Sequence, residues 1–127
     1  MGNLNGESYQ IQADNDHIVI RSYFDGYTGG KTLNTEGFEP KLIKAGHVVI
    51  KNAEGVFKPM PVEGEKYAAL PEGFGYAGVV VATKQTKYPF VGILTQGTVN
   101  HIAAPYDLST ILEDVKKACP LIEFRAD

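Results

Sequence analysis

A glycine-rich loop is the first segment whose residue types could do chemistry, and it runs Gly26-Tyr27-Thr28-Gly29-Gly30-Lys31-Thr32. A phosphate-binding loop has the pattern Gly-x-x-x-x-Gly-Lys-Ser/Thr and opens a helix whose N-terminus meets the phosphates. Counting back from Gly30, the first glycine of that pattern should stand at position 25, where this chain has Asp25. The residues after Thr32 reach Gly37 too soon for the required helix. The pattern therefore indicates a glycine-rich turn rather than a nucleotide site.

Three histidines could hold a metal ion only if the fold brought them together. His17, His47 and His101 each lack a second histidine at the i+2 or i+4 spacing of a local metal motif. Histidines from separate strands do converge in some zinc enzymes, so a metal-dependent enzyme is kept as the least favoured alternative. We interpret His47 and His101 instead as hydrogen-bonded residues at strand ends. No metal and no other cofactor is predicted.

Nucleophilic catalysis is not indicated by the remaining reactive residues. Cys119, the single cysteine, lies beside an apolar helix pattern and just before Pro120. It is predicted to be a buried structural thiol, whereas catalysis needs an exposed thiolate with a neighbouring base. The serines Ser8, Ser22 and Ser109 stand in no Gly-x-Ser-x-Gly context. The sequence therefore predicts a protein that is not an enzyme.

Composition and charge exclude several classes of protein. The 127 residues suit one domain, and 43% hydrophobic with 21% charged residues is ordinary for a globular chain. Twelve basic against fifteen acidic residues give a net charge of -3, which argues against a nucleic-acid partner. No apolar run approaches the roughly 20 residues that a membrane-spanning helix needs. Neither nucleic acid nor a membrane is expected as a partner.

The elements that must position these residues are mostly short strands. Runs of β-branched and aromatic residues, bounded by Gly, Pro, Asn and Asp, mark the strands. The turn over 52–55 joins two of them into a hairpin in which Pro59 marks an edge or the end of pairing. The predicted strands cover 17–23, 47–51, 56–60, 76–83, 90–95, 97–102 and 121–124.

One helix is predicted near the C-terminus. Its apolar face has the spacing i, i+3, i+4, i+7 and i+10, with Asp107 or Ser109 able to cap it, a capping-box spacing at Thr110 and Glu113, and Pro120 ending it. The residues of that face are Leu108, Ile111, Leu112, Val115 and Ala118. The fold class is therefore mainly β with one C-terminal helix, either β-barrel-like or an α+β domain.

The first 30 residues are predicted to form an extended N-terminal arm, in part without order of its own, in front of a β-rich domain over 31–127. The polar residues at its start can bury little surface by themselves. Aromatic residues nevertheless gather in the first 45 positions, and two interpretations stay open: anchors in a protein interface, or a cover for an open sheet edge of the same chain. These residues are Tyr9, Tyr23, Phe24, Tyr27 and Phe38.

Several segments from residue 17 onward resemble the small head-fibre or head-decoration proteins of tailed phages and prophages. The order of strands is also similar, more loosely, to that of the lambdoid head decoration proteins. The segments that carry the resemblance are Arg21-Ser22-Tyr23, Thr28–Leu33, Ile43–Ile50, Lys58–Pro61, Tyr67–Pro71, Pro89–Leu94, Gly97–Asn100, Ala104–Tyr106 and Leu121–Arg125.

The resemblance implies a structural virion protein, made in the cytoplasm of a bacterial host, that binds the outer surface of a phage capsid and stabilises the head. Its partner would be the major capsid protein, and it would form a homotrimer. The arm would reach onto the shell, so the predicted capsid-binding residues are Ile18, Ile20, Tyr23 and Tyr27. The alternative is a small β-domain adhesion module that binds a glycan or another host surface ligand. Aromatic residues in a rigid cleft would favour that alternative, whereas aromatic residues on a mobile arm would favour decoration.

Overall fold

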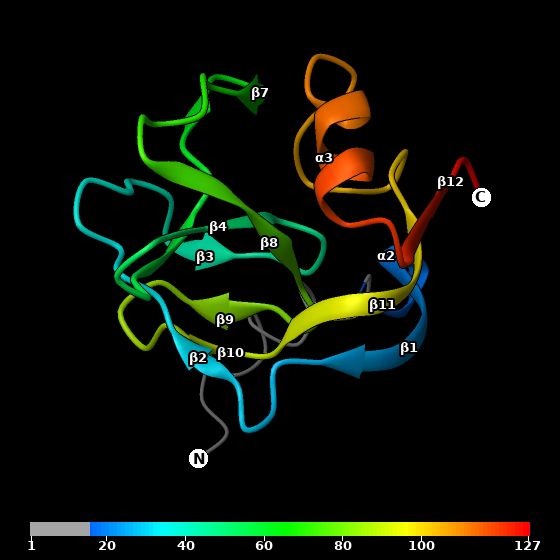
Figure 1. Ribbon diagram of the computed structural model, residues 1–127, viewed down its shortest axis with the longest axis horizontal. Helices are drawn as coiled ribbons and strands as arrows, with labels where there is room; N and C mark the ends of the chain where they lie inside the picture. Colours follow the sequence, from blue (N-terminus) through cyan, green and yellow to red (C-terminus); the bar gives the residue numbers. More distant parts are fainter. Residues whose placement is uncertain (1–15) are drawn as a thin grey trace.

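The computed structural model describes residues 16–127, which form a mainly β structure with a C-terminal helix, as predicted (Figure 1). The helices are α2 (Asp16–Val19) and α3 (Leu112–Ala118). The strands are β1 (Ile20–Gly26), β2 (Lys31–Thr32), β3 (Leu42–Ile43), β4 (Val48–Asn52), β5 (Phe57–Pro59), β6 (Val62–Glu63), β7 (Lys66–Tyr67), β8 (Phe74–Val80), β9 (Lys84–Gln85), β10 (Phe90–Val91), β11 (Ile93–Asn100) and β12 (Ile122–Arg125). Within this range no helix is long and apolar enough to cross a membrane.

Six strands form the main sheet, in the order β1-β11-β8-β4-β5, with β12 paired in parallel to β11. Strand β11 carries β1 along one edge, while its opposite edge pairs first with β8 and then with β12. Two-stranded ribbons flank the sheet: β2 with β10, β3 with β9, and β6 with β7. In the described residues β1 and β5 are the two ends of the sheet order, so this sheet is open rather than closed into a barrel.

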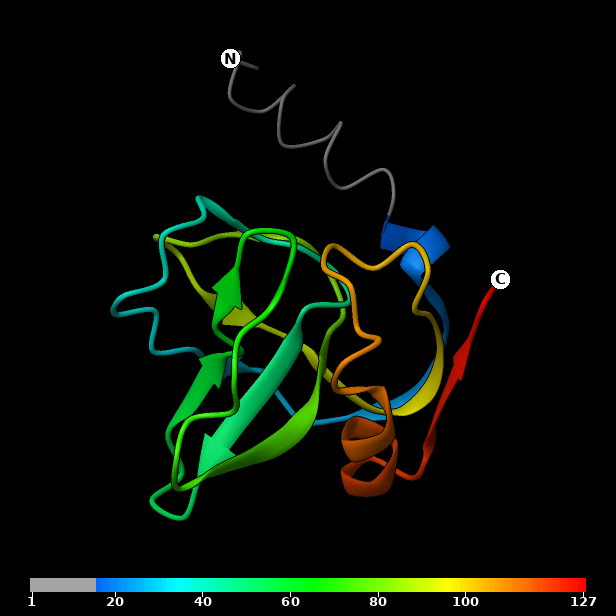
Figure 2. The same ribbon diagram turned by 90° about the horizontal axis from the view of Figure 1, so that it is seen from above.

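Two hydrophobic clusters lie on opposite faces of the central strands. Along β4, Val48 and Ile50 enter one cluster, and Val49 between them enters the other, as the period of two along a strand requires. Helix α3 covers the first cluster with Leu112 and Val115, and Figure 2 shows it beside the sheet. Because both faces are covered there, Val48–Ile50 of β4 and Ala77–Val80 of β8 are continuously apolar and buried.

The predicted hairpin is confirmed. Strands β4 and β5 pair antiparallel, with Val49 opposite Pro59, and β5 stands at the end of the sheet order, where a residue without an N–H does least harm. The predicted pairing of the strands around 80 and 93 is also present, with Ile93 opposite Val80. The separate strand predicted over 97–102 does not exist, because one strand, β11, continues from 93 to 100.

The C-terminal helix is shorter than its apolar pattern. The N-cap position is Ile111, whose apolar side chain cannot accept a hydrogen bond, so the helix has no side-chain cap. The predicted cap by Asp107 or Ser109 and the predicted capping box at Thr110 and Glu113 are therefore wrong. Asp107 instead accepts hydrogen bonds from the N–H and the hydroxyl of Ser109. Ala118 is exposed, and the buried residue at that end is Cys119, as predicted.

The predicted arm does not extend through residues 16–30. The carboxylate of Asp16 accepts hydrogen bonds from the N–H and the hydroxyl of Thr83 at 2.8 and 2.6 Å, and Val19 is buried in the first cluster. The strand predicted over 17–23 begins as the short helix α2, and β1 then pairs with β11. Residues 16–30 thus belong to the folded domain, because the sheet supplies their hydrogen bonds. Residues 1–15 of the predicted arm lie outside the described residues.

Strand β1 reaches β11 by a close backbone approach at Gly97. Gly97 has φ of +156°, and a Cβ at this position would collide with the carbonyl oxygen of Ser22 on β1. Gly78 on β8 meets the carbonyl oxygen of Leu94 in the same way. Glycine is required at both positions because the neighbouring backbone occupies the space of a side chain.

We expect Gly97→Ala to lower the free energy of unfolding by about 2 kcal/mol or more, because the methyl group forces β1 away from β11. Gly75→Ala is the matched control, since Gly75 also lies in a sheet strand but has open space at its Cβ position, and it should change stability by about 0.5 kcal/mol at most. Urea denaturation of both variants measures the difference. Equal stability of the two variants would contradict the close approach.

Candidate functional site

The most exposed apolar side chains of the domain's first strand define a candidate binding surface. All residues from Arg21 to Asp25 are exposed, with 54% of Tyr23 and 73% of Phe24 accessible to solvent. No strand within residues 16–127 pairs with the outer edge of β1. We call Ile18, Tyr23 and Phe24, together with this open edge, the β1 surface.

Three irregularities interrupt the pairing of β1 with β11. The register shifts between Ile20 and Ser22, between Tyr23 and Asp25, and between Asp25 and Gly26. A bulge inserts one unpaired residue and twists the strand, so the inward–outward alternation along β1 is interrupted, and the neighbouring Tyr23 and Phe24 are both exposed. Phe24 is among the aromatic residues noted in the first 45 positions of the sequence but is not one of the four predicted capsid-binding residues.

The four predicted capsid-binding residues do not share one surface. Ile18 in α2 is 39% exposed, and Tyr23 points outward. Ile20 is half-buried and packs against the first cluster. Tyr27 is half-buried against Phe57, with ring centroids 5.2 Å apart in an edge-to-face pair. Two of the four residues are therefore available to a partner, and the other two hold the strand in place.

The glycine-rich loop over 26–32 is held against its neighbours by Tyr27 and Lys31. The hydroxyl of Tyr27 accepts a hydrogen bond from Nζ of Lys51 at 3.1 Å. Nζ of Lys31 lies 5.6 Å from the centre of the Phe57 ring. Lys31 belongs to the glycine-rich loop, where Gly29 and Gly30 both have φ of +78°. The loop leads into strand β2 and not into a helix, so it lacks the helix N-terminus that a phosphate-binding loop needs. The loop is a turn, as predicted.

A second pair of exposed aromatic residues lies where the chain leaves β9 and enters β10, of which Phe90 is the first residue. Tyr88 is 69% and Phe90 is 56% exposed, on either side of Pro89. The sequence prediction assigned this segment only a chain break before a strand. The signal available in the sequence was an aromatic residue on each side of a proline.

His47 is buried at the centre of the molecule. Its Nε2 lies 2.9 Å from the carbonyl oxygen of Met60 and donates to it, and its ring centroid lies between 5.2 and 5.4 Å from three aromatic rings. Burial lowers the pKa of His47 to about 4, because the apolar surroundings disfavour the charged form. The three rings are those of Phe38, Tyr67 and Tyr106.

The three histidines lie in different environments. His47 is buried, His17 is exposed in α2, and His101 is half-buried just after β11, where its N–H donates to the carbonyl oxygen of Arg125. His47 and His101 thus have the strand-end positions that were predicted. In the described part of the chain no three His, Cys, Asp or Glu side chains gather as a metal site.

An open depression of about 600 Å³ lies beside α3, with Glu65, His101, Asp107 and Glu113 in its lining. Hydrogen bonds from Ser109 hold the pKa of Asp107 below its usual range. This carboxylate is therefore an acceptor at neutral pH and not a proton donor.

Burial raises the pKa of the Cys119 thiol, which keeps it protonated and unreactive.

The position of His47 predicts a stability that depends on pH. In the folded protein the pKa of His47, about 4, lies below the ordinary histidine value of 6.5, so the unfolded chain binds this proton more readily. The stability that the neutral His47 contributes is fully present above pH 6.5, and about 3 kcal/mol of the free energy of unfolding is lost as the pH falls towards 4. Urea denaturation at pH 7, 5.5 and 4 measures the loss.

His47→Gln is the control for this prediction, because its amide can donate to Met60 but does not titrate. This substitution can lower the free energy of unfolding at pH 7. Between pH 6.5 and 4, however, the free energy of unfolding of the variant should depend less on pH than that of the unchanged protein. Parallel pH profiles for the two proteins would show that other groups cause the acid sensitivity.

Comparisons with known proteins identify no relative of this chain. No protein-family model matches it, no curated protein matches it, and no solved structure matches it.

Proposed function

We propose that this protein binds the outer surface of a tailed-phage capsid, as a head-decoration or head-fibre protein, and stabilises the head. One observation carries the proposal: the β1 surface combines an unpaired strand edge with two exposed aromatic side chains. The resemblance of the chain to such proteins from residue 17 onward supports the same role.

The shape of β1 favours contact through side chains over the addition of a long partner strand. An open edge can accept a strand from another chain, but the three register shifts in the pairing of β1 with β11 leave only Ser22 and Tyr23 in consecutive pairs. Bulges of this kind protect an edge from indiscriminate pairing. Aromatic side chains on a rigid strand can still enter pockets on a partner, as interface anchors do.

The proposal assigns different roles to the four residues predicted from the sequence. Ile18 and Tyr23, with Phe24 added, would contact the major capsid protein. Ile20 and Tyr27 would fix the position of β1 by packing on the two clusters. The binding needs no cofactor and no catalytic step, so the protein would not be an enzyme. It would act on the virion after synthesis in the cytoplasm of the bacterial host, as a homotrimer.

A second candidate function, an adhesion module that binds a glycan or another host surface ligand, is favoured by a separate observation. Tyr88 and Phe90 are exposed on a segment whose backbone is hydrogen-bonded on both sides of Pro89. Rigidly held rings of this kind suit stacking on a ligand. The two candidates use different strands, and variants can therefore separate them.

We expect Tyr23→Ser combined with Phe24→Ser to weaken binding to empty heads of the encoding phage about tenfold or more, because each anchor contributes about 1 kcal/mol or more. Co-sedimentation of the purified protein with the heads over a concentration series measures the affinity. The matched control is Ile102→Ser combined with Leu121→Ser, which removes two exposed apolar side chains away from β1.

The control variant should pellet like the unchanged protein. If both double variants bind equally well, the capsid contact does not use the β1 surface. If the unchanged protein stays in the supernatant, capsid decoration is wrong. Thermal denaturation checks that neither variant has lost its fold.

A further inference from the structure

The segment Lys87-Tyr88-Pro89-Phe90, which we call the aromatic platform, is held rigidly although its rings are exposed. The N–H of Tyr88 donates to the carbonyl oxygen of Gln85, and the N–H of Phe90 donates to that of Tyr88, both at 2.9 Å. The carbonyl oxygen of Pro89 accepts from the N–H of Leu33, also at 2.9 Å. Since Leu33 is buried in the second cluster, the turn is fixed to the core.

The ring of Phe90 lies against the glycine-rich loop. Phe90 pairs with Thr32 across the β2–β10 ribbon, and a Cβ at Gly30 would come within 3.2 Å of two atoms of the Phe90 ring. The absence of a side chain at Gly30 thus leaves room for the Phe90 ring beside the backbone of the loop. The loop supports the ring at its Cε2 and Cζ atoms, and 56% of the side chain remains open to solvent.

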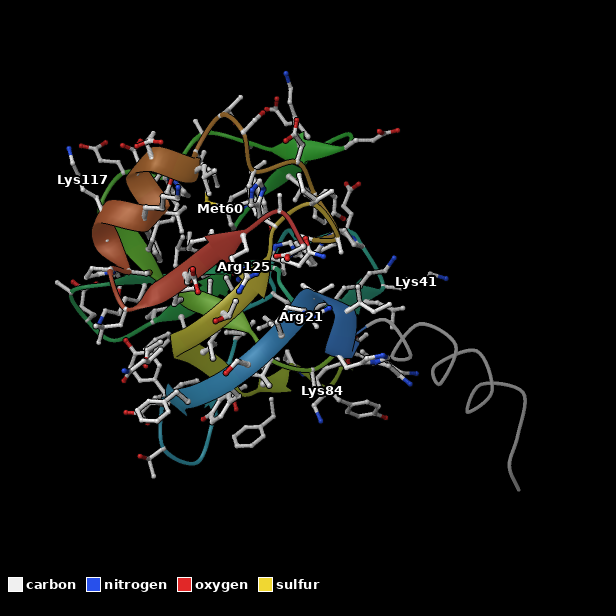
Figure 3. The ribbon with its side chains drawn as sticks, turned by 90° about the vertical axis from the view of Figure 1, so that its right-hand side faces the viewer. Arg21, Lys41, Met60, Lys84, Lys117 and Arg125 are labelled. Carbon is white, nitrogen blue, oxygen red and sulfur yellow. The ribbon has the colours of Figure 1, made fainter. Side chains whose placement is uncertain are left out.

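Positive charge surrounds the platform. Nζ of Lys87 lies 5.6 Å from the centre of the Tyr88 ring, and Lys84 belongs to β9, which leads into the platform. The N–H of Thr86 donates to the carbonyl oxygen of Lys41 at 2.9 Å, which places Lys41 beside the same segment. Figure 3 shows Lys41 and Lys84 projecting outward. Among residues 16–127 the one ion pair is Arg125 with Asp127, so none of these lysines has a carboxylate partner there.

We propose that the aromatic platform binds an acidic saccharide, with Tyr88 and Phe90 stacking on sugar rings and Lys84 and Lys87 pairing with carboxylates. This inference rests on the second candidate function, adhesion, and names its ligand class. It does not depend on capsid binding by the β1 surface.

The chemistry of the platform favours a charged sugar over other ligands. The negative face of an aromatic ring attracts the slightly positive C–H groups of a sugar, and a single ring can act without a surrounding apolar area. A protein hot spot needs neighbouring contacts that exclude water, whereas the residues that precede Tyr88 in the chain are the polar Gln85, Thr86 and Lys87. Lysines that have no carboxylate partner among residues 16–127 add local attraction for carboxylates, although the chain has a net charge of -3.

The test is native affinity electrophoresis of the full chain in gels that contain polygalacturonate, with dextran as the neutral comparison. We expect retardation by polygalacturonate and much less by dextran. Tyr88→Ala combined with Phe90→Ala should raise the dissociation constant about tenfold, through the loss of two stacking contacts. Lys84→Gln combined with Lys87→Gln should raise it several-fold for polygalacturonate alone.

Phe24→Ala is the matched control, because it removes an equally exposed ring from β1 and should leave saccharide binding unchanged. Equal retardation by dextran would overturn the acidic specificity and leave the adhesion function standing. No retardation by either polymer would overturn both. Retardation that is lost in the lysine variant but kept in the aromatic variant would show unspecific attraction of charge and would also overturn the proposal.

A loss of head binding in the Tyr88→Ala, Phe90→Ala variant, without any retardation of the unchanged protein, would make the platform a protein contact instead. Each of these outcomes leaves the test of the β1 surface intact, because that test uses other residues and another partner.

Discussion

The rest of the structure depends on the pairing of one strand, β11, with three others. It hydrogen-bonds to β1 on one edge and to β8 and β12 on the other. Two of these approaches are possible only because Gly78 and Gly97 leave room for a carbonyl oxygen of the neighbouring strand. Both the first core cluster and the β1 surface follow from this arrangement, since β1 has no other strand to hold it in the described residues.

The aromatic residues fall into an inner and an outer set, and burial decides which role each can have. Phe38, Tyr67 and Tyr106 surround His47 and connect loops that are distant in sequence. A buried imidazole in such a cage is neutral, and the acid sensitivity that we expect of the domain follows from that packing. The outer set comprises Tyr23, Phe24, Tyr88 and Phe90. Large rings left in water on rigid backbone are more useful for binding than for stability.

The two exposed surfaces have different chemistry. The β1 surface is apolar at an open strand edge, which suits a protein partner. The aromatic platform is surrounded by lysines without carboxylate partners in the described part of the chain, which suits an anionic ligand. A virion-surface protein could use both, one to attach itself to the head and one to meet a carbohydrate outside it. The glycine-rich loop, which the sequence predicts to be a turn and not a nucleotide site, lies against the Phe90 ring.

The sequence by itself determined the elements whose signals are local. Alternation and a turn specify the β4–β5 hairpin, the helical period specifies the buried face of α3, and a small apolar neighbourhood specifies the burial of Cys119. Only the tertiary structure decided that residues 16–30 join the sheet, that a bulge turns Phe24 outward, and that Leu33 fixes the turn below Tyr88 and Phe90. These depend on backbone contacts between segments dozens of residues apart, and no periodicity along the chain records which distant strand will supply a hydrogen bond.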